Sequence, residues 1–411
     1  MHPQSLSAVL NPTVRRTQRL YRYPPPLCRP DSLFYTNGDR ASMAENGRTL
    51  ERAFYVDALM NMAGDGKIKI VCGMRGVGKT EIMKQLMARL KEAKKDCVYI
   101  DAESADFLEV GYTDALMKKI SEAAGPGPMT VIVDEISRID GWTAALYNLT
   151  RSGKLEFYIT SSVDPSDVLK GASIANGYEL LTVRPLSLRE FMDLNGIEGE
   201  SNGAEFYRIY GGMPCIRTSM GPSDARRALR SLYFEILYNS LEKGADAADV
   251  RCFADYLMEH IGEGLSKEDL KGFLDKRGMG TKKMIEGLER SYLIKVFAPG
   301  VFKGSAYRFY AADIGLRNSL PGVRRDWKAE TENIVIDELV RRGQEPEAGK
   351  GDGESLKSKG IDGISVTYIV TDSPVLDTEI QSGLRSGRTV QIVPETEEHR
   401  GTKLSAFMLG E

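Results

Sequence analysis

Residues 73–80 read GMRGVGKT, and this segment constrains the fold more than any other part of the chain. It fits the pattern G-x-x-x-x-G-K-T, in which backbone N–H groups of a glycine-rich turn surround phosphate oxygens. The apolar residues 67–72 precede it, and apolar side chains recur at helical spacing over residues 80–93. Because such a loop joins a buried strand to a helix, the sequence predicts a nucleotide site at this junction.

We expect the whole loop to contact the nucleotide, which we predict to be ATP. The Lys79 ammonium is predicted to reach the β- and γ-phosphates, and the Thr80 hydroxyl to bind Mg²⁺. The predicted nucleotide-binding residues are Gly73, Met74, Arg75, Gly76, Val77, Gly78, Lys79, Thr80 and Glu81.

Residues 129–135, MTVIVDE, predict a central apolar strand that ends in two acids. Asp134 is placed to hold Mg²⁺, and Glu135 to polarise the attacking water. Ser161 or Ser162 ends a later strand, where a polar sensor of the γ-phosphate is expected; we assign Ser161. The alternative is that this serine merely ends the strand.

The order of strands along the chain favours one branch of P-loop proteins. The predicted strand 97–102 intervenes between the P-loop strand and the strand that ends in Asp134 and Glu135. Together with Glu135, this favours ATPases with a catalytic glutamate over small-molecule kinases and GTPases. The sequence has no N-K-x-D guanine reader.

Strand and helix patterns alternate up to Pro185 and predict a parallel sheet covered by helices. We therefore expect an α/β fold: a P-loop parallel-sheet ATPase domain, a helical and winged-helix region, and a small α+β C-terminal domain. The predicted divisions are 1–42, a disordered tail or a mis-called start; 43–195, the ATPase domain; 196–325, the helical lid and winged-helix region; and 326–411, a nuclease-like domain without activity.

Composition excludes several classes of protein. The net charge of −3 does not steer the whole molecule toward nucleic acid or membrane. The five cysteines form no C-x-x-C pair, which argues against a zinc site or a disulfide framework and fits a reducing compartment. The three histidines do not cluster, which argues against a histidine metal site or a Ser-His-Asp triad. No apolar run is long enough for a membrane span, so we expect a cytoplasmic protein.

Residues 266–310 predict a winged helix. Ser266 and Asp269 form a helix-start signal, Thr281 is a candidate cap for a second helix, and a β-ribbon follows. Residues 266–308 hold ten Lys or Arg against five Asp or Glu, and Lys282 and Lys283 open the second helix. These lysines are candidate contacts to double-stranded DNA. The alternative is that the module only packs between domains or binds a protein.

Seven segments occur in an order that resembles a known family. They are CGMRGVGKTEIMKQL, VIVDEISRIDGW, YITSS, RPLSLREFM, YGGMPCIR, LERSYLI and YAADIGLRNSL. The chain resembles prokaryotic AAA-type P-loop ATPases that carry a C-terminal domain of unknown function 4143. The resemblance covers residues 51–343 and implies an ATPase fold, with an oligomer as one expectation.

The resemblance also assigns individual residues. Arg75 matches an arginine within the family's P-loop, and Pro185, Leu186, Ser187, Glu190 and Phe191 match its linker segment. The family often has an arginine where this chain has Gly177. If that arginine completes a neighbouring active site, this chain hydrolyses slowly, or Arg184 or Arg189 substitutes.

The C-terminal portion resembles a nuclease-like fold. Glu332 and Asn333 match its paired motif, and Asp362 its second carboxylate. Glu379 and Gln381 are candidates for the remaining group, at uncertain spacing. Because no Lys is clearly placed beside the two carboxylates, we expect a structural or ligand-binding domain.

Three functions follow. The first is an ATP hydrolase that couples nucleotide state to a partner, DNA or protein. The second is a regulatory switch that hydrolyses ATP poorly. The third is an ATP-driven nuclease with Glu332 and Asp362 as metal ligands.

Overall fold

The structure is a computed structural model that describes most of the chain from Leu50 onward. The described residues are 50–107, 112–151, 153–172, 174, 177–240, 246–274, 280–297, 306–348, 355–359, 365–370, 389–395 and 402–410. The predicted tail 1–42 lies outside them, as do Asp362, Glu379 and Gln381. No helix of the described residues is long and apolar enough to cross a membrane.

A five-stranded parallel sheet forms the first half of the described chain, as predicted, with the order β2-β3-β4-β1-β5. Its strands are β1 (Ile68–Cys72), β2 (Cys97–Asp101), β3 (Met129–Asp134), β4 (Leu155–Ser161) and β5 (Tyr178–Thr182). The predicted strand 97–102 intervenes only along the chain: in the sheet, β2 is an edge and β4 separates β1 from β3.

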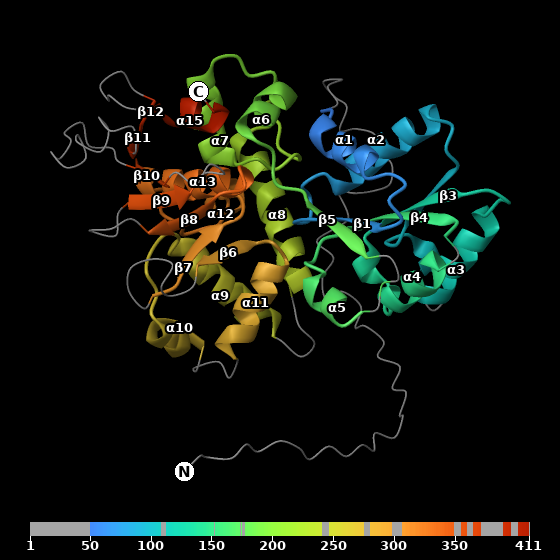
Figure 1. Ribbon diagram of the computed structural model, residues 1–411. Helices are drawn as coiled ribbons and strands as arrows, with labels where there is room; N and C mark the ends of the chain where they lie inside the picture. Colours follow the sequence, from blue (N-terminus) through green and yellow to red (C-terminus); the bar gives the residue numbers. More distant parts are fainter. Residues whose placement is uncertain are drawn as a thin grey trace, which may run out of the picture. The chain divides into compact units, whose positions relative to one another are not determined.

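Helices cover both faces of this sheet (Figure 1). Alternate residues of β1 point to opposite faces, so Val71 joins a core with α1 and α2, and Ile70 joins a core with α3 and α4. The helical elements of this part are α1 (Ala53–Asn61), α2 (Lys79–Glu92), η2 (Ala105–Phe107), α3 (Tyr112–Ala123), η3 (Ile136–Arg138), α4 (Trp142–Thr150) and α5 (Ser166–Lys170).

A helical region follows the sheet. Ser187 begins α6 with a capping box, because its hydroxyl accepts from the Glu190 N–H and the Glu190 carboxylate accepts from the Ser187 N–H. The helices are α6 (Leu188–Asn195), α7 (Glu200–Tyr210), α8 (Pro222–Ser240) and α9 (Ala247–Glu259).

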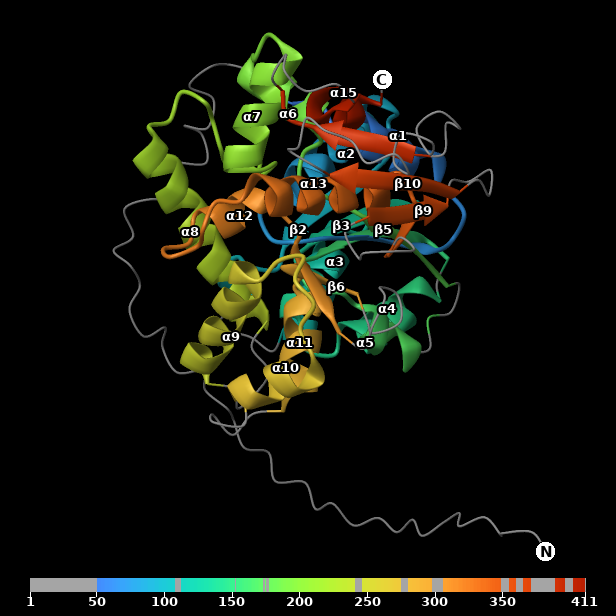
Figure 2. The same cartoon turned by 90° about the vertical axis from the view of Figure 1, so that its left-hand side faces the viewer.

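The described residues of 265–311, where we predict a winged helix, form two helices and a two-stranded ribbon. The elements are α10 (Lys267–Leu274), α11 (Thr281–Arg290), β6 (Ile294–Phe297) and β7 (Arg308–Ala311), with β6 and β7 antiparallel. Figure 2 shows β6 beside α11. Met284 and Leu288 are buried, and Ile285 between them is partly buried. The predicted cap at Thr281 is wrong: Gly280 is the N-cap, and no side chain caps the helix.

The C-terminal part has the α+β character that we predicted. A short helix, α12 (Ile314–Asn318), leads to α13 (Trp327–Arg341). A mixed sheet has the order β12-β11-β10-β9-β8 and is followed by α15 (Leu404–Leu409). Its strands are β8 (Glu345–Ala348), β9 (Ser355–Lys359), β10 (Ser365–Val370), β11 (Thr389–Val393) and β12 (Thr402–Lys403).

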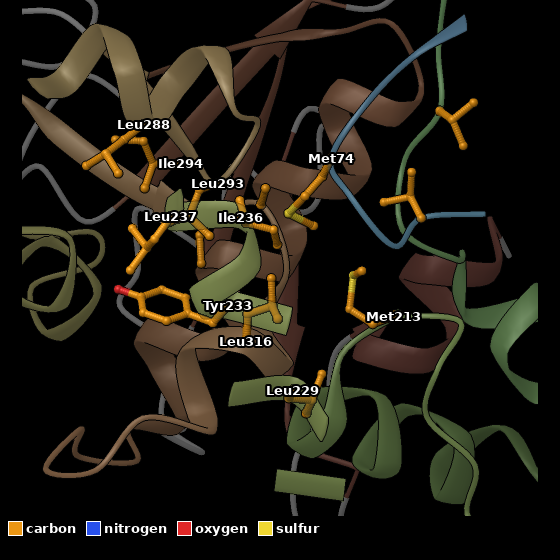
Figure 3. Close-up of a cluster of buried hydrophobic side chains, with 14 of the residues drawn as sticks. Met74, Met213, Leu229, Tyr233, Ile236, Leu237, Leu288, Leu293, Ile294 and Leu316 are labelled. Atoms are coloured by element: carbon orange, nitrogen blue, oxygen red, sulfur yellow. The ribbon is translucent and has the colours of Figure 1, made fainter. Parts of the chain in front are cut away.

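One apolar core crosses the predicted boundary between the sheet and the helical region. Met74 of the P-loop belongs to the same cluster as Ile236 of α8 and Leu288 of α11 (Figure 3). The residues that carry the phosphate-binding motif are thus packed directly on the helices that follow the sheet.

Candidate nucleotide site

Backbone conformation gives the 73–80 segment its shape. Gly78 is the N-cap of α2 and has a φ of 94°, a left-handed conformation that glycine adopts without strain. At Gly73, an added Cβ would lie 2.2 Å from the Val183 carbonyl oxygen. These two glycines therefore fix the turn and its packing on the chain after β5.

Lys79 is buried and folded back onto its own loop. Its Nζ donates to the carbonyl oxygens of Gly73 at 2.9 Å and Met74 at 3.2 Å. It also donates to Ser162 Oγ at 2.8 Å and lies 3.4 Å from Glu135 Oε1. A phosphate that binds in the loop would replace these partners of the ammonium group.

Asp134 ends β3 and faces the first turn of α2. Its Oδ2 accepts from Thr80 Oγ1 and Tyr99 OH, both at 2.7 Å, and its Oδ1 accepts from Thr160 Oγ1 at 2.5 Å. The hydroxyl and carboxylate predicted to hold Mg²⁺ thus lie side by side, because β1 and β3 both end at this edge of the sheet.

Glu135 has a left-handed backbone with a φ of 57°, which is uncommon for a residue with a side chain. The turn directs its carboxylate toward Ser162, whose hydroxyl donates to Oε1 at 2.5 Å and whose N–H donates to Oε2 at 3.1 Å. Burial raises the pKa of Glu135, but the Lys79 ammonium and the Ser162 hydroxyl outweigh it and hold the pKa below its usual range. The group is ionised at neutral pH.

The two serines at the end of β4 have different partners. Ser161 Oγ donates to the Val163 carbonyl at 2.5 Å, within its own loop. Ser162, the first residue beyond the strand, instead joins Lys79 to Glu135. Ser162 is therefore the better candidate for a sensor of the phosphate.

Arg75 holds the outer side of the P-loop. Its guanidinium makes a two-bond ion pair with Glu103, at 2.8 and 3.1 Å, and donates to Glu235 of α8 at 3.0 Å. Burial lowers the pKa of Arg75, but the Glu103 contacts outweigh it and raise the pKa. The P-loop is thereby linked to the chain after β2 and to α8.

Sequence analysis missed Arg52, which supports the loop from behind. This buried side chain donates to the Val77 carbonyl at 3.0 Å, to the Arg184 carbonyl at 3.3 Å, and to both Glu190 oxygens at 2.9 and 3.1 Å. Its only sequence signal is its position just before the first helix. In the structure, its guanidinium carbon lies 4.6 Å from the centre of the Tyr55 ring.

Gly177 stands where the resembled family often has an arginine, and Arg184 and Arg189 are the candidate substitutes. The three residues have different surroundings. Gly177 has a φ of 81°, and its carbonyl accepts from the Ile68 N–H at the start of β1. Arg189 is exposed on α6. Arg184 is partly buried, and burial together with the Arg341 charge lowers its pKa.

Lys282 and Lys283 are exposed at the start of α11, and Lys282 lies 3.5 Å from Glu286 on the same helix. The other end of α11 reaches the nucleotide site. The Arg290 carbonyl accepts from the Asp164 N–H at 2.8 Å, two residues beyond Ser162. One helix thus connects the loop after β4 to the candidate DNA contacts.

The C-terminal candidates have structural partners. Glu332 Oε1 accepts from the Tyr310 hydroxyl at 2.6 Å. The Asn333 side chain pairs with the Ala311 backbone, accepting from its N–H at 2.8 Å and donating to its carbonyl at 2.9 Å. Both side chains tie α13 to β7.

The sheet order and the P-loop geometry define a P-loop α/β domain, and a family comparison assigns it more closely. Residues 65–192 match the family model described as an AAA domain. The model ends at residue 192, so the resemblance of the C-terminal part to a domain of unknown function remains a prediction.

Similar proteins were found in sequence and in structure. A Haemophilus influenzae protein described as uncharacterized is 24% identical over 342 residues, which cover 77% of this chain and 84% of that protein. The replication initiator DnaA bound to AMPPCP and single-stranded DNA is 14% identical, with a TM-score of 0.31, over 57% of this chain and 85% of that one. A DNA replication initiation factor is 15% identical, with a TM-score of 0.28, over 63% and 90%. These TM-scores are low, so the assignment rests on the family model and the strand order.

Proposed function

We propose that the AAA domain binds and hydrolyses ATP at residues 73–81 and couples this cycle to the helices that follow it. The observation that carries the proposal is the meeting of Lys79, Ser162 and Glu135 within hydrogen-bond or ion-pair distance at the carboxyl ends of β1, β3 and β4. Lys79 is the cation, Ser162 the polar sensor and Glu135 the candidate base. Together they could contact one phosphate group.

Glu135 is suited to act as the general base. It is ionised at neutral pH and buried, and its carboxylate contacts the Ser162 hydroxyl and the Lys79 ammonium. When Lys79 turns to the phosphates, the carboxylate loses a cation and can accept a proton from water. The water oxygen then forms a bond to the γ-phosphorus, and the bond between the γ-phosphorus and the β–γ bridging oxygen breaks. The products are ADP and phosphate.

Thr80 and Asp134 fit Mg²⁺. They are hard oxygen donors 2.7 Å apart, and an ion held by a hydroxyl, a carboxylate, water and phosphate oxygens is usual at such a loop. The described residues contain no cluster of three His, Cys, Asp or Glu, which agrees with a metal that depends on the nucleotide. When bound, Mg²⁺ would neutralise phosphate charge.

The regulatory switch is the second candidate, and two observations favour it. Lys79 already has four protein partners, and Gly177 stands where the resembled family often has an arginine. Slow hydrolysis with firm nucleotide binding would distinguish the switch from an efficient hydrolase. For the C-terminal domain we keep the proposal of a structural role, since Glu332 and Asn333 serve contacts to β7.

The test is the Glu135→Gln variant, with Glu92→Gln as a matched control, because Glu92 is exposed at the far end of α2 from the P-loop. Glu135→Gln should retain ATP binding and lose about 100-fold or more in turnover, since the amide cannot take a proton. Glu92→Gln should keep turnover within about twofold. Equal turnover in both variants would remove Glu135 as the base, and loss of binding in Glu135→Gln would leave its catalytic role unsupported.

DNA is the partner that we propose for α11. The support is the exposure of Lys282 and Lys283 at one end of the helix and the Asp164–Arg290 hydrogen bond at the other. Duplex affinity should fall steeply with salt, and Lys282→Glu with Lys283→Glu should reduce the log–log salt slope by about 0.9 for each lost phosphate contact. An unchanged slope would argue for a protein partner.

A further inference from the structure

A cavity of about 370 Å³ lies where α7, α8 and α12 meet, away from the residues of the P-loop. This volume is within the range of small-molecule pockets, which is about 300–1,000 Å³. Tyr210, Leu229 and Leu320 give it an apolar wall, and Arg226, Arg230 and Arg325 supply its charge. No acidic residue is among the described residues that line it.

Two of these arginines are exposed and have no acidic partner within the described part of the chain. Arg226 and Arg230 are four residues apart on α8 and so lie on the same face of the helix. Both are exposed, and within the described part of the chain no ion pair is found for either. Their neighbour Arg227, by contrast, lies 3.5 Å from Asp224 and does not line the cavity.

The third arginine shares its carboxylate with two others. Glu330 is fully buried and contacts Arg325 at 2.9 Å, Arg208 at 2.5 Å and Arg317 at 3.7 Å. Arg208 also contacts Glu205 at 2.7 Å. Asp326 and Glu259 also act on Arg317, so acidic groups balance this arginine cluster, and among the described residues the unpaired positive charge at the cavity comes from Arg226 and Arg230.

We propose that this cavity binds a small organic phosphate. Its dianionic head would take two-bond contacts from the arginines, whose planar guanidinium matches phosphate oxygens. Its compact apolar body would pack on Tyr210, Leu229 and Leu320. The site is independent of the proposed ATP site and does not rest on ATP hydrolysis.

Phenyl phosphate is the probe, titrated by calorimetry into the full-length protein and into two variants. Arg226→Ala/Arg230→Ala should weaken its binding at least about tenfold, because charge-assisted hydrogen bonds are lost. The matched control Arg227→Ala should stay within about twofold of the wild type. Phenol, the neutral analogue, should produce no binding heat.

The wild type and both arginine variants keep the same P-loop, so any phosphate binding there contributes equally to all three. Adding Lys79→Ala to each protein should therefore leave the tenfold difference intact. Melting temperatures check that the exposed substitutions leave the fold unchanged. Equal affinity in Arg226→Ala/Arg230→Ala and the wild type would overturn the proposal, as would equal binding of phenol, or no binding to the wild type. Failure of the ATP proposal would instead appear in nucleotide titrations.

Discussion

Two pairs of adjacent polar residues stand out in this sequence, an Asp–Glu pair and a Glu–Asn pair, and the fold gives them different surroundings. Asp134 and Glu135 end a parallel strand, and their oxygens face Thr80 and Ser162 from neighbouring elements. Glu332 and Asn333 lie inside α13, where β7 occupies their side chains. The carboxyl ends of parallel strands bring polar groups from distant segments to one edge, whereas a buried helix face uses them for packing.

Loss of the P-loop cation should have the largest effect at the first pair. Lys79→Ala should weaken ATP binding about 100-fold or more, because the ammonium is the buried cation closest to the phosphates in the proposed site. Lys84→Ala is the matched control, since Lys84 is exposed on the same helix. Titration with a fluorescent ATP analogue measures both. Comparable affinity in the two variants would refute the P-loop assignment.

Asn333→Ala should act on stability and leave nucleotide binding alone. It strands the buried Ala311 N–H and carbonyl, which costs about 2–4 kcal/mol of unfolding free energy for two lost partners. Asn202→Ala, at an exposed position on α7, should change stability by less than about 0.5 kcal/mol. Urea denaturation gives the first quantity and nucleotide titration the second. A loss of ATP affinity in Asn333→Ala would break the division between the two regions.

The two serines after β4 sharpen the comparison within the site itself. Ser162→Ala should lower kcat about tenfold, because it removes hydrogen bonds to Lys79 and Glu135. Ser161→Ala should stay within about twofold, since its hydroxyl bonds to the Val163 carbonyl. Steady-state ATP turnover decides the matter. A larger loss in Ser161→Ala would restore the serine chosen from sequence.

The strands and the motif loop were predictable because continuous apolar runs and the glycine pattern are local signals. The position of β4 between β1 and β3 was not, since order along the chain does not fix order in a sheet. The choice between Ser161 and Ser162 was open for a related reason: pleat alternation predicts side-chain direction only up to Ser161, where β4 ends. Arg52 has no motif at all, and its role depends on partners as distant in sequence as Glu190.

The pH dependence of stability should show the smallest effect and tests the charge of Glu135 directly. Burial raises the pKa of this carboxyl, but Lys79 and Ser162 hold it below the usual value of about 4.3. Because the pKa is lower in the folded than in the unfolded state, ionised Glu135 stabilises the protein above its unfolded pKa. This contribution is lost as the pH falls through the folded pKa.

The unfolding free energy of the wild type should therefore exceed that of Glu135→Gln at about pH 7, and the gap should shrink at about pH 3. Urea denaturation of both proteins at each pH measures the gap, and other titrating groups cancel in the difference. A gap that is constant or grows on acidification would mean that Lys79 does not stabilise the ionised carboxylate, which would remove the electrostatic link between the P-loop and the end of β3.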